Sequence, residues 1–217
     1  MPATTPRRLI VGISGASGIV YGVRLLALLR RTAVETHVVV SRAAKVTLAL
    51  ETELALADLH DLADVVYQPG DIGAAISSGS FRTAGMIVCP CSMRTLAEIA
   101  NGITASLLTR AADVVLKERR RLVLVARETP LHLGHLRNMA AVTEMGAIVY
   151  PPVPAMYARP ASIDEMIDHT VGRVLDLFDI DVGTVRRWRE TADMPAEGAP
   201  AEDAPVADEP DEMPDGA

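Results

Sequence analysis

The sequence is poor in aromatic residues, cysteine and long apolar runs. Phe, Trp and Tyr make up 3% of its 217 residues, so the core must be built from aliphatic side chains and Met. A stacking surface for single-stranded nucleic acid is therefore not expected. No apolar run is long enough to span a bilayer, and the first eight residues lack the apolar stretch of a signal peptide. We therefore expect a cytoplasmic protein with no nucleic-acid or membrane partner.

The sequence contains two cysteines, Cys89 and Cys91, on either side of a proline. A disulfide across this spacing would be strained, and two thiols alone do not make a zinc site. The chain also lacks an Asp-Asp-x-x-Asp pattern on an apolar helix, which would indicate a magnesium–diphosphate site. We expect reduced, largely buried thiols and no metal.

Negative charge is concentrated at the end of the chain. The formal net charge is −7, but residues 191–217 contain nine acids, five prolines and no Lys or Arg. Residues 1–190 therefore hold 19 acids against all 21 Lys and Arg, a net charge of +2. An acidic segment of this composition cannot bury enough apolar surface to offset its ordering entropy. The sequence predicts one folded domain over residues 1–190 and a disordered acidic tail over residues 191–217.

Short apolar runs alternate with stretches of helical spacing. The runs predict strands at Arg8–Ile13, Glu35–Ser41, Ala63–Tyr67, Gly85–Cys91, Arg121–Arg127 and Ala147–Tyr150. Helices are expected at Ile19–Arg31, Arg42–Leu50, Arg94–Ala100, Ala105–Lys117 and Leu133–Met145, then behind the cap Ser162 and at Val182–Glu190. Because the runs are apolar throughout, they predict an α/β fold with a mostly parallel sheet covered on both faces.

In such a sheet, ligands bind beyond the carboxyl ends of the strands. The first strand leads into a glycine loop at residues 12–18, whose amides can approach an anion beside the positive end of the next helix. Ser14 and Ser17 add hydroxyl groups to this loop. A tight strand–helix turn explains the same glycines equally well. After the strand that ends at Cys91, Ser92 can either cap a helix or contact a ligand.

A cation and an acid, Arg127 and Glu128, follow another strand just before a proline. Arginine binds phosphate bidentately, and a glutamate whose pKa burial raises can transfer a proton. A solvent-exposed ion pair is the alternative.

The second strand ends at Ser41 and Arg42, where a dinucleotide-binding fold that uses NAD would carry an acid. An arginine there can accommodate the 2′-phosphate of NADP, so an NADP-dependent reductase is an alternative. Against it, the chain lacks a Tyr-x-x-x-Lys pair.

Seven motifs occur in a characteristic order. They are Gly-Ile-Ser-Gly-Ala-Ser-Gly at 12–18, Ser-Ser-Gly-Ser-Phe at 77–81, Pro-Cys-Ser-Met-Arg-Thr-Leu-Ala-x-Ile-Ala-Asn-Gly at 90–102, Arg-Ala-Ala-Asp-Val-x-Leu-Lys-Glu at 110–118, Arg-Glu-Thr-Pro-Leu at 127–131, His-Leu-x-Asn-Met at 135–139 and Pro-Pro-x-Pro-Ala-Met-Tyr at 151–157. Over about residues 8–190 the chain resembles the flavin prenyltransferases of the UbiX type, a family that includes small B subunits associated with hydroxyarylic acid decarboxylases.

The resemblance implies a single flavodoxin-like or Rossmann-like three-layer domain. Such a domain binds reduced FMN and joins a dimethylallyl group from dimethylallyl phosphate to N5 and C6 of the flavin, without a metal. The product, prenylated FMN, is the cofactor of UbiD-type decarboxylases, which are the implied recipients. The resemblance also implies a homododecamer whose sites are completed by neighbouring subunits.

The resemblance also implies roles for individual residues. The implied flavin-binding residues are Gly15, Ala16, Ser17, Ser41, Ser92, Met93, Arg94, Thr95 and Arg127. The residues implied for the allylic phosphate are Arg110, Lys117, Tyr157 and Arg173, together with Glu128. These cations and the phenol would stabilise the departing phosphate.

Four residues are expected to act in catalysis. Glu128 would protonate the phosphate, and Ser17 would relay a proton from the flavin. Glu51 matches a family acid near the flavin, and the π face of Trp188 can steady an allyl cation. Met156 stands where the family frequently has an aromatic residue, so we expect a prenyl pocket of different shape.

Two further functions remain as alternatives. The first is an FMN-dependent decarboxylase of the phosphopantothenoylcysteine type, which resembles this chain in fold but whose His and Asn-containing motifs are not found here. The second is a non-catalytic subunit that delivers flavin to a hydroxyarylic acid decarboxylase.

Overall fold

The computed structural model describes residues 7–188. The chain divides into two units, Met1–Val185 and Arg186–Ala217. The predicted acidic tail at residues 191–217 lies outside the described residues, so its predicted disorder stays a prediction. The fold described below is that of the first unit.

One six-stranded sheet forms the centre of the first unit, with the strand order β3-β2-β1-β4-β5-β6. The strands are β1 (Arg7–Ile13), β2 (Val34–Val40), β3 (Val65–Tyr67), β4 (Gly85–Cys91), β5 (Arg121–Ala126) and β6 (Ile148–Val149). Every neighbouring pair is parallel, which confirms the predicted parallel sheet. The chain order reverses between β1 and β4, so the loops that follow these two strands diverge and open a crevice.

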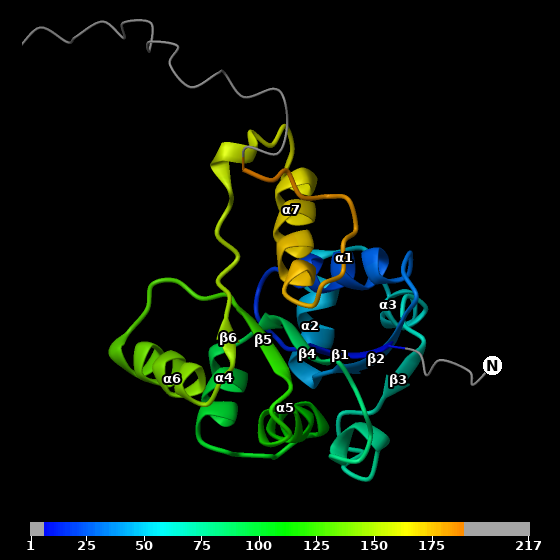
Figure 1. The fold of residues 1–217 in the computed structure, drawn as a ribbon, viewed down its shortest axis with the longest axis vertical. Coiled ribbons are helices and arrows are strands. Elements are labelled where there is room, and N and C mark those ends of the chain that lie inside the picture. Colours follow the sequence, from blue (N-terminus) through cyan, green and yellow to red (C-terminus); the bar gives the residue numbers. More distant parts are fainter. Residues whose placement is uncertain (1–6, 189–217) are drawn as a thin grey trace, which may run out of the picture. The chain divides into compact units, whose positions relative to one another are not determined.

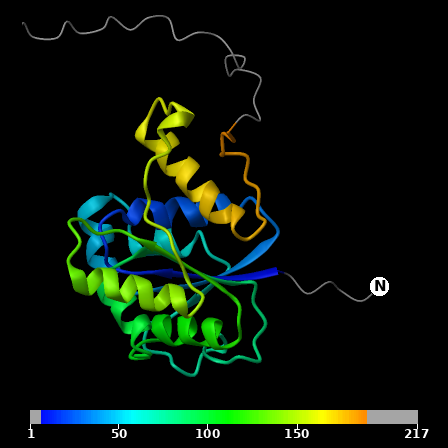
Figure 2. The ribbon, with the colours of Figure 1, turned by 60° about the vertical axis from the view of Figure 1, so that its left-hand side comes forward.

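Helices cover both faces of the sheet (Figure 1 and Figure 2). The helices are α1 (Ile19–Leu29), α2 (Arg42–Glu51), α3 (Leu56–His60), α4 (Met93–Ala100), α5 (Leu107–Lys117), α6 (Leu133–Glu144) and α7 (Ile163–Asp176), with short 3-10 turns η1 (Ala75–Ser77) and η2 (Met156–Ala158). Buried residues of α1, α2, α3 and α7 join one core, and buried residues of α4, α5 and α6 join the other. The unit is therefore a three-layer flavodoxin-like domain.

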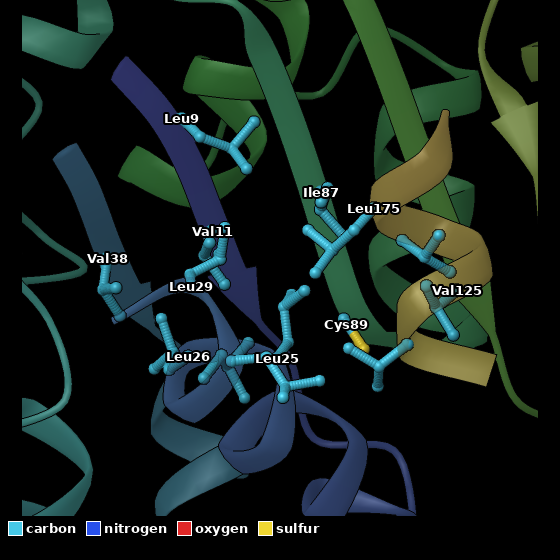
Figure 3. Packing of buried hydrophobic residues seen from close by; sticks show 14 of the residues in the cluster. Leu9, Val11, Leu25, Leu26, Leu29, Val38, Ile87, Cys89, Val125 and Leu175 are labelled. Carbon is cyan, nitrogen blue, oxygen red and sulfur yellow. The ribbon is translucent and has the colours of Figure 1, made fainter. Parts of the chain in front are cut away.

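Alternation along each strand divides the apolar side chains between the two cores. Leu9 and Val11 of β1 belong to the same core as Leu26 and Leu29 of α1 (Figure 3), whereas Ile10 belongs to the core on the opposite face. Successive side chains of a strand point to opposite faces, so a strand buried on both faces is apolar throughout. Each such buried aliphatic side chain contributes about 1.5–3 kcal/mol.

The predicted helix at Val182–Glu190 is wrong over residues 182–188, which contain no helix. Instead, Thr184 and Val185 lie against Gly172 of α7, where a Cβ atom would be 2.4 Å from Thr184 Oγ1. Thr184 Oγ1 also donates to the Asp168 carbonyl at 3.0 Å. Thr184 and Val185 therefore pack on α7 without forming a helix.

The structure also contains a helix that the sequence did not predict. Helix α3 has five residues, and the Asp58 carboxylate accepts from the Ala55 amide at 2.8 Å to start it. Within residues 7–188, no helix combines the length and apolarity needed to cross a membrane.

Candidate active site

A cleft of about 400 Å³ lies at the carboxyl ends of the strands. Five predicted flavin-binding residues line it, namely Gly15, Ser41, Ser92, Arg94 and Thr95. They come from the loop after β1, from the end of β2 and from the start of α4. The structure therefore brings these five residues together at one cleft, and their contacts with a flavin stay a prediction.

Three helices begin at the cleft, each capped by a serine. Ser41 Oγ accepts from the Ala44 amide of α2 at 3.1 Å, and Ser92 Oγ accepts from the Thr95 amide of α4 at 3.3 Å. Ser106 caps α5 in the same way and also lines the cleft. Helix N-termini carry positive partial charge and favour anions. The cleft is therefore suited to a phosphate group. Arg42 and Arg94 in its lining add positive charge, and Glu98, also in the lining, pairs with Arg94 Nε at 2.9 Å.

The sequence did not indicate that Ser106 belongs to the site. Ser106 stands immediately before the apolar residues of α5, a position typical of a helix cap. A cap in the sequence does not show which part of the fold the start of that helix faces.

Ser14 ties together the two loops on either side of the crevice. Its hydroxyl donates to the Pro90 carbonyl at 3.0 Å and accepts from the Ser92 amide at 2.7 Å. The side chain is 1% exposed. Ser14 therefore fixes the glycine loop against the start of α4 and is not available to a ligand, contrary to the expectation from sequence.

Glu51, at the end of α2, occupies the N-terminus of α1. Its Oε2 accepts from the Gly18 amide at 2.8 Å and from the Ile19 amide at 3.0 Å. Burial raises the pKa of this carboxyl, but hydrogen bonds from the Ser17 side chain and these two amides, with the charge of Arg127, bring it below its ordinary value. The positive end of α1, which we expected to face a ligand, is therefore neutralised by the chain's own carboxylate.

Arg127 and Glu128 follow β5 and are both exposed in the single chain. The Arg127 amide donates to the Cys91 carbonyl at 3.3 Å, and a Cβ atom on Gly18 would lie 3.5 Å from Arg127 Cδ. The stem of Arg127 therefore lies over the glycine loop, as its predicted role requires. Glu128 Oε1 accepts from the adjacent Thr129 amide at 3.1 Å, and the side chain is exposed, so one chain does not supply the burial on which its predicted proton transfer depends.

Tyr157 and Arg173 belong to a second group of residues, beyond β6. The Tyr157 ring lies 5.9 Å from the His169 ring, and Arg173 Nη1 lies 2.6 Å from Asp176 Oδ2 on the same helix. Tyr150, at the end of β6, joins this group. Burial raises the pKa of its hydroxyl, and the charge of Arg173 opposes that rise. The sequence did not single out Tyr150.

Arg110 and Lys117 lie on α5, on the opposite face of the sheet from α7. Arg110 Nη1 pairs with Asp113 at 2.7 Å and Lys117 Nζ pairs with Glu118. A single chain therefore does not bring the four residues predicted for the allylic phosphate together.

The remaining predicted residues divide between the core and the second unit. Ala16 and Met93 are buried beside the cleft residues. Trp188 belongs to the second unit, so its predicted role stays a prediction.

Cys89 and Cys91 are free and buried, as expected. Among residues 7–188, no group of three or more His, Cys, Asp or Glu side chains is placed to hold a metal ion.

Comparison with known proteins shows that this chain is similar to flavoproteins over most of its length. The family model for flavoproteins matches residues 3–179. The flavin prenyltransferase UbiX of Neisseria meningitidis is 58% identical over 187 residues, which are 86% of this chain and 99% of that protein.

Two solved structures are similar to this chain over their whole length. One, AnUbiX (PadA1) in complex with FMN and dimethylallyl pyrophosphate, is 53% identical with a TM-score of 0.84, covering 85% of this chain and 98% of that one. The other, a dodecameric FMN-dependent UbiX-like decarboxylase from Escherichia coli O157:H7, is 52% identical with a TM-score of 0.82, covering 84% and 99%.

Proposed function

Because the chain belongs to the flavin prenyltransferases of the UbiX type, we propose that it joins the dimethylallyl group of dimethylallyl phosphate to N5 and C6 of reduced FMN. The main support for the proposal is the cleft beyond the carboxyl ends of β1 and β4, between which the chain order of the sheet reverses. Three serine-capped helix N-termini and two arginines lie together in its lining. FMN supplies the flavin atoms that accept the dimethylallyl group.

The residues present fit a phosphate-bearing flavin. A Cβ atom on Gly15 would lie 2.4 Å from the Ala43 Cβ, so only glycine lets this loop approach the start of α2 and leave the cleft open. Ser41, Ser92, Arg94 and Thr95 offer hydroxyls, amides and a guanidinium there, and the exposed Arg127 offers a second guanidinium. These donors would hold the flavin and its phosphate.

The allylic phosphate requires positive charge beside the departing group. Tyr157 and Arg173 lie near each other in one chain, around Tyr150, and would bind this phosphate. Arg110 and Lys117 face away from them, so we propose that a neighbouring subunit contributes them. A dodecamer, as described for the similar Escherichia coli structure, would supply such a neighbour and would cover Glu128.

Proton transfer from the flavin is assigned in this proposal to Ser17, with Glu51 as the residue that orients it. The hydrogen bond from the Ser17 side chain to the Glu51 carboxylate orients the serine hydroxyl beside the glycine loop. Ser17 would pass a proton from the flavin, and the low pKa of Glu51 keeps it ionised as the acceptor of that hydrogen bond.

We further propose that prenylated FMN passes to a UbiD-type decarboxylase and that the protein works in the cytoplasm, where thiols such as those of Cys89 and Cys91 stay reduced. The reductase and decarboxylase alternatives are not favoured, because the relatives at 55–61% identity are described as flavin prenyltransferases or UbiX-like flavin prenyltransferases.

The test is anaerobic incubation of the protein with reduced FMN and dimethylallyl phosphate. We expect one phosphate released per flavin and a flavin whose mass increases by one dimethylallyl group. An unchanged flavin mass would contradict the proposal. Release of carbon dioxide from an aromatic acid by the isolated protein would instead support a decarboxylase.

A further inference from the structure

A second cleft, of about 510 Å³, lies at the opposite edge of the sheet, where the strands begin. Arg7 and Arg121, in its lining, are the first residues of β1 and β5, and Arg119 and Arg120 form the turn that leads into β5. Strand β1 has seven residues, so this edge is about 20 Å from the candidate active site. The flavin cleft and this cleft are therefore separate.

Positive charge in this cleft is largely uncompensated. No acidic residue lines it, and across residues 7–188 no carboxylate lies within 4.0 Å of Arg7, Arg119 or Arg121. Arg120 is engaged by the fold, because it donates to the Phe81 carbonyl at 2.7 Å and to the Gly79 carbonyl at 2.6 Å. Arg7 likewise donates to the Phe178 carbonyl. Arg119 and Arg121 are thus the guanidinium groups that a ligand can use.

The backbone holds Arg119 in an unusual conformation. Its φ is +55°, in the left-handed region where glycine is the preferred residue after a helix. A residue with a Cβ atom costs about 1–2 kcal/mol there. The turn therefore holds an arginine at the rim of the cleft in a conformation that glycine would adopt with less strain.

The rest of the cleft is apolar. Leu116, Met145, Ile148 and Phe178 line it, and Phe178 is 1% exposed. The guanidinium carbon of Arg121 lies 5.7 Å from the centroid of the Phe178 ring, so this cation sits where the polar rim meets the apolar wall. A ligand that matches both parts carries a compact anionic group on an apolar body.

We propose that this cleft binds a small organic phosphate, with its phosphate group on Arg119 and Arg121 and its apolar body against Leu116, Met145 and Ile148. A phosphate dianion matches two guanidinium groups better than a single carboxylate does, because each guanidinium can donate two parallel hydrogen bonds to phosphate oxygens. The cleft volume is in the range of small-ligand sites, about 300–1,000 Å³.

The test uses phenyl phosphate as the probe and isothermal titration calorimetry of the full chain. It is carried out in Arg173→Ala protein, so that the proposed prenyl-phosphate site contributes little. Arg119→Gln and Arg121→Gln should each weaken binding by about tenfold or more, since a hydrogen-bonded charge pair is lost. Arg31→Gln is the matched control, because Arg31 is an exposed arginine just before β2, at the same edge of the sheet.

Three binding results would overturn the proposal. They are no binding of phenyl phosphate, an equal loss of affinity in the Arg31→Gln control, and inorganic phosphate binding as tightly as phenyl phosphate, which would show that the apolar wall is unused. Sedimentation of the variants adds a further test. If Arg121→Gln changes the mass of the assembly, the cleft is a contact between subunits and the proposal is wrong. The prenyl-transfer rate of Arg119→Gln and Arg121→Gln should match that of the unmodified protein.

Discussion

Removal of the Glu51 carboxylate tests whether this side chain holds the glycine loop in place. Glu51 Oε2 accepts from the Gly18 and Ile19 amides at 2.8 and 3.0 Å, which is the role of a helix cap supplied by another helix. Loss of a cap costs about 0.5–2 kcal/mol. Because this oxygen accepts from two amides, we expect Glu51→Ala to destabilise the start of α1 by about 1–2 kcal/mol. Glu51→Gln keeps an oxygen acceptor and loses only the charge, so about 0.5 kcal/mol is expected.

Hydrogen exchange measures this local effect directly. A loss of 1–2 kcal/mol corresponds to exchange roughly 5–30-fold faster in a peptide that covers residues 14–25. Glu53→Ala is the matched control, because Glu53 lies two residues further along the chain and is also exposed. The reasoning is refuted if Glu51→Ala leaves exchange unchanged, or if Glu53→Ala accelerates it equally.

The dependence on pH follows from the lowered pKa of Glu51. Since the ionised form is favoured in the folded state, its contribution is complete above the ordinary value of 4.5 and is lost as the pH falls through the lowered pKa. Protection of residues 14–25 should therefore decrease below about pH 4.5 in the unmodified protein and change less in Glu51→Gln. An identical acid profile in both proteins would contradict this account.

Three further predictions concern the cleft, the second phosphate-binding group and the thiols. Gly15→Ala should abolish FMN binding, measured by flavin fluorescence, because its Cβ would lie 2.4 Å from a neighbouring side chain, whereas Gly70→Ala in the same cleft meets nothing within 4 Å and should bind normally. Arg173→Ala should raise the KM for dimethylallyl phosphate at least tenfold and leave the Kd of FMN nearly unchanged; equal effects on both would contradict the assignment. Burial raises the pKa of the Cys89 and Cys91 thiols far above the usual range, so neither should react with iodoacetamide at pH 8 in the folded protein, and both should react in urea.

Most of the sheet could be predicted from sequence because each strand is apolar throughout. A run such as residues 121–126, buried at five of its six positions, is typical of a strand covered on both faces. Helix α3 could not be predicted in this way, because a five-residue helix held by Asp58 is too short for a helical period to appear. The error at residues 182–185 has a different cause, since Thr184 and Val185 pack against Gly172 of α7, a contact that a helical period does not show.

The sequence could predict which residues lie together where their position follows directly from the end of a strand. Ser41, Ser92 and Arg94 come immediately after strands, and the carboxyl ends of parallel strands share one edge. The cap that Glu51 provides could not be inferred, because it depends on how α2 returns to the start of α1, 32 residues away in sequence. The separation of Arg110 and Lys117 from Arg173 could not be inferred either, because it depends on which face of the sheet each helix covers.

The Ser14 hydroxyl limits how the protein can be redesigned. It donates to Pro90 and accepts from Ser92, two residues of one loop that lie 76 and 78 positions further along the chain. Its side chain is buried, so water cannot replace these bonds. Alanine would lose both bonds, and a bulkier hydroxyl side chain would have to displace its neighbours. Libraries that vary the glycine loop to accept other flavins should therefore keep serine at this position and diversify the residues around it.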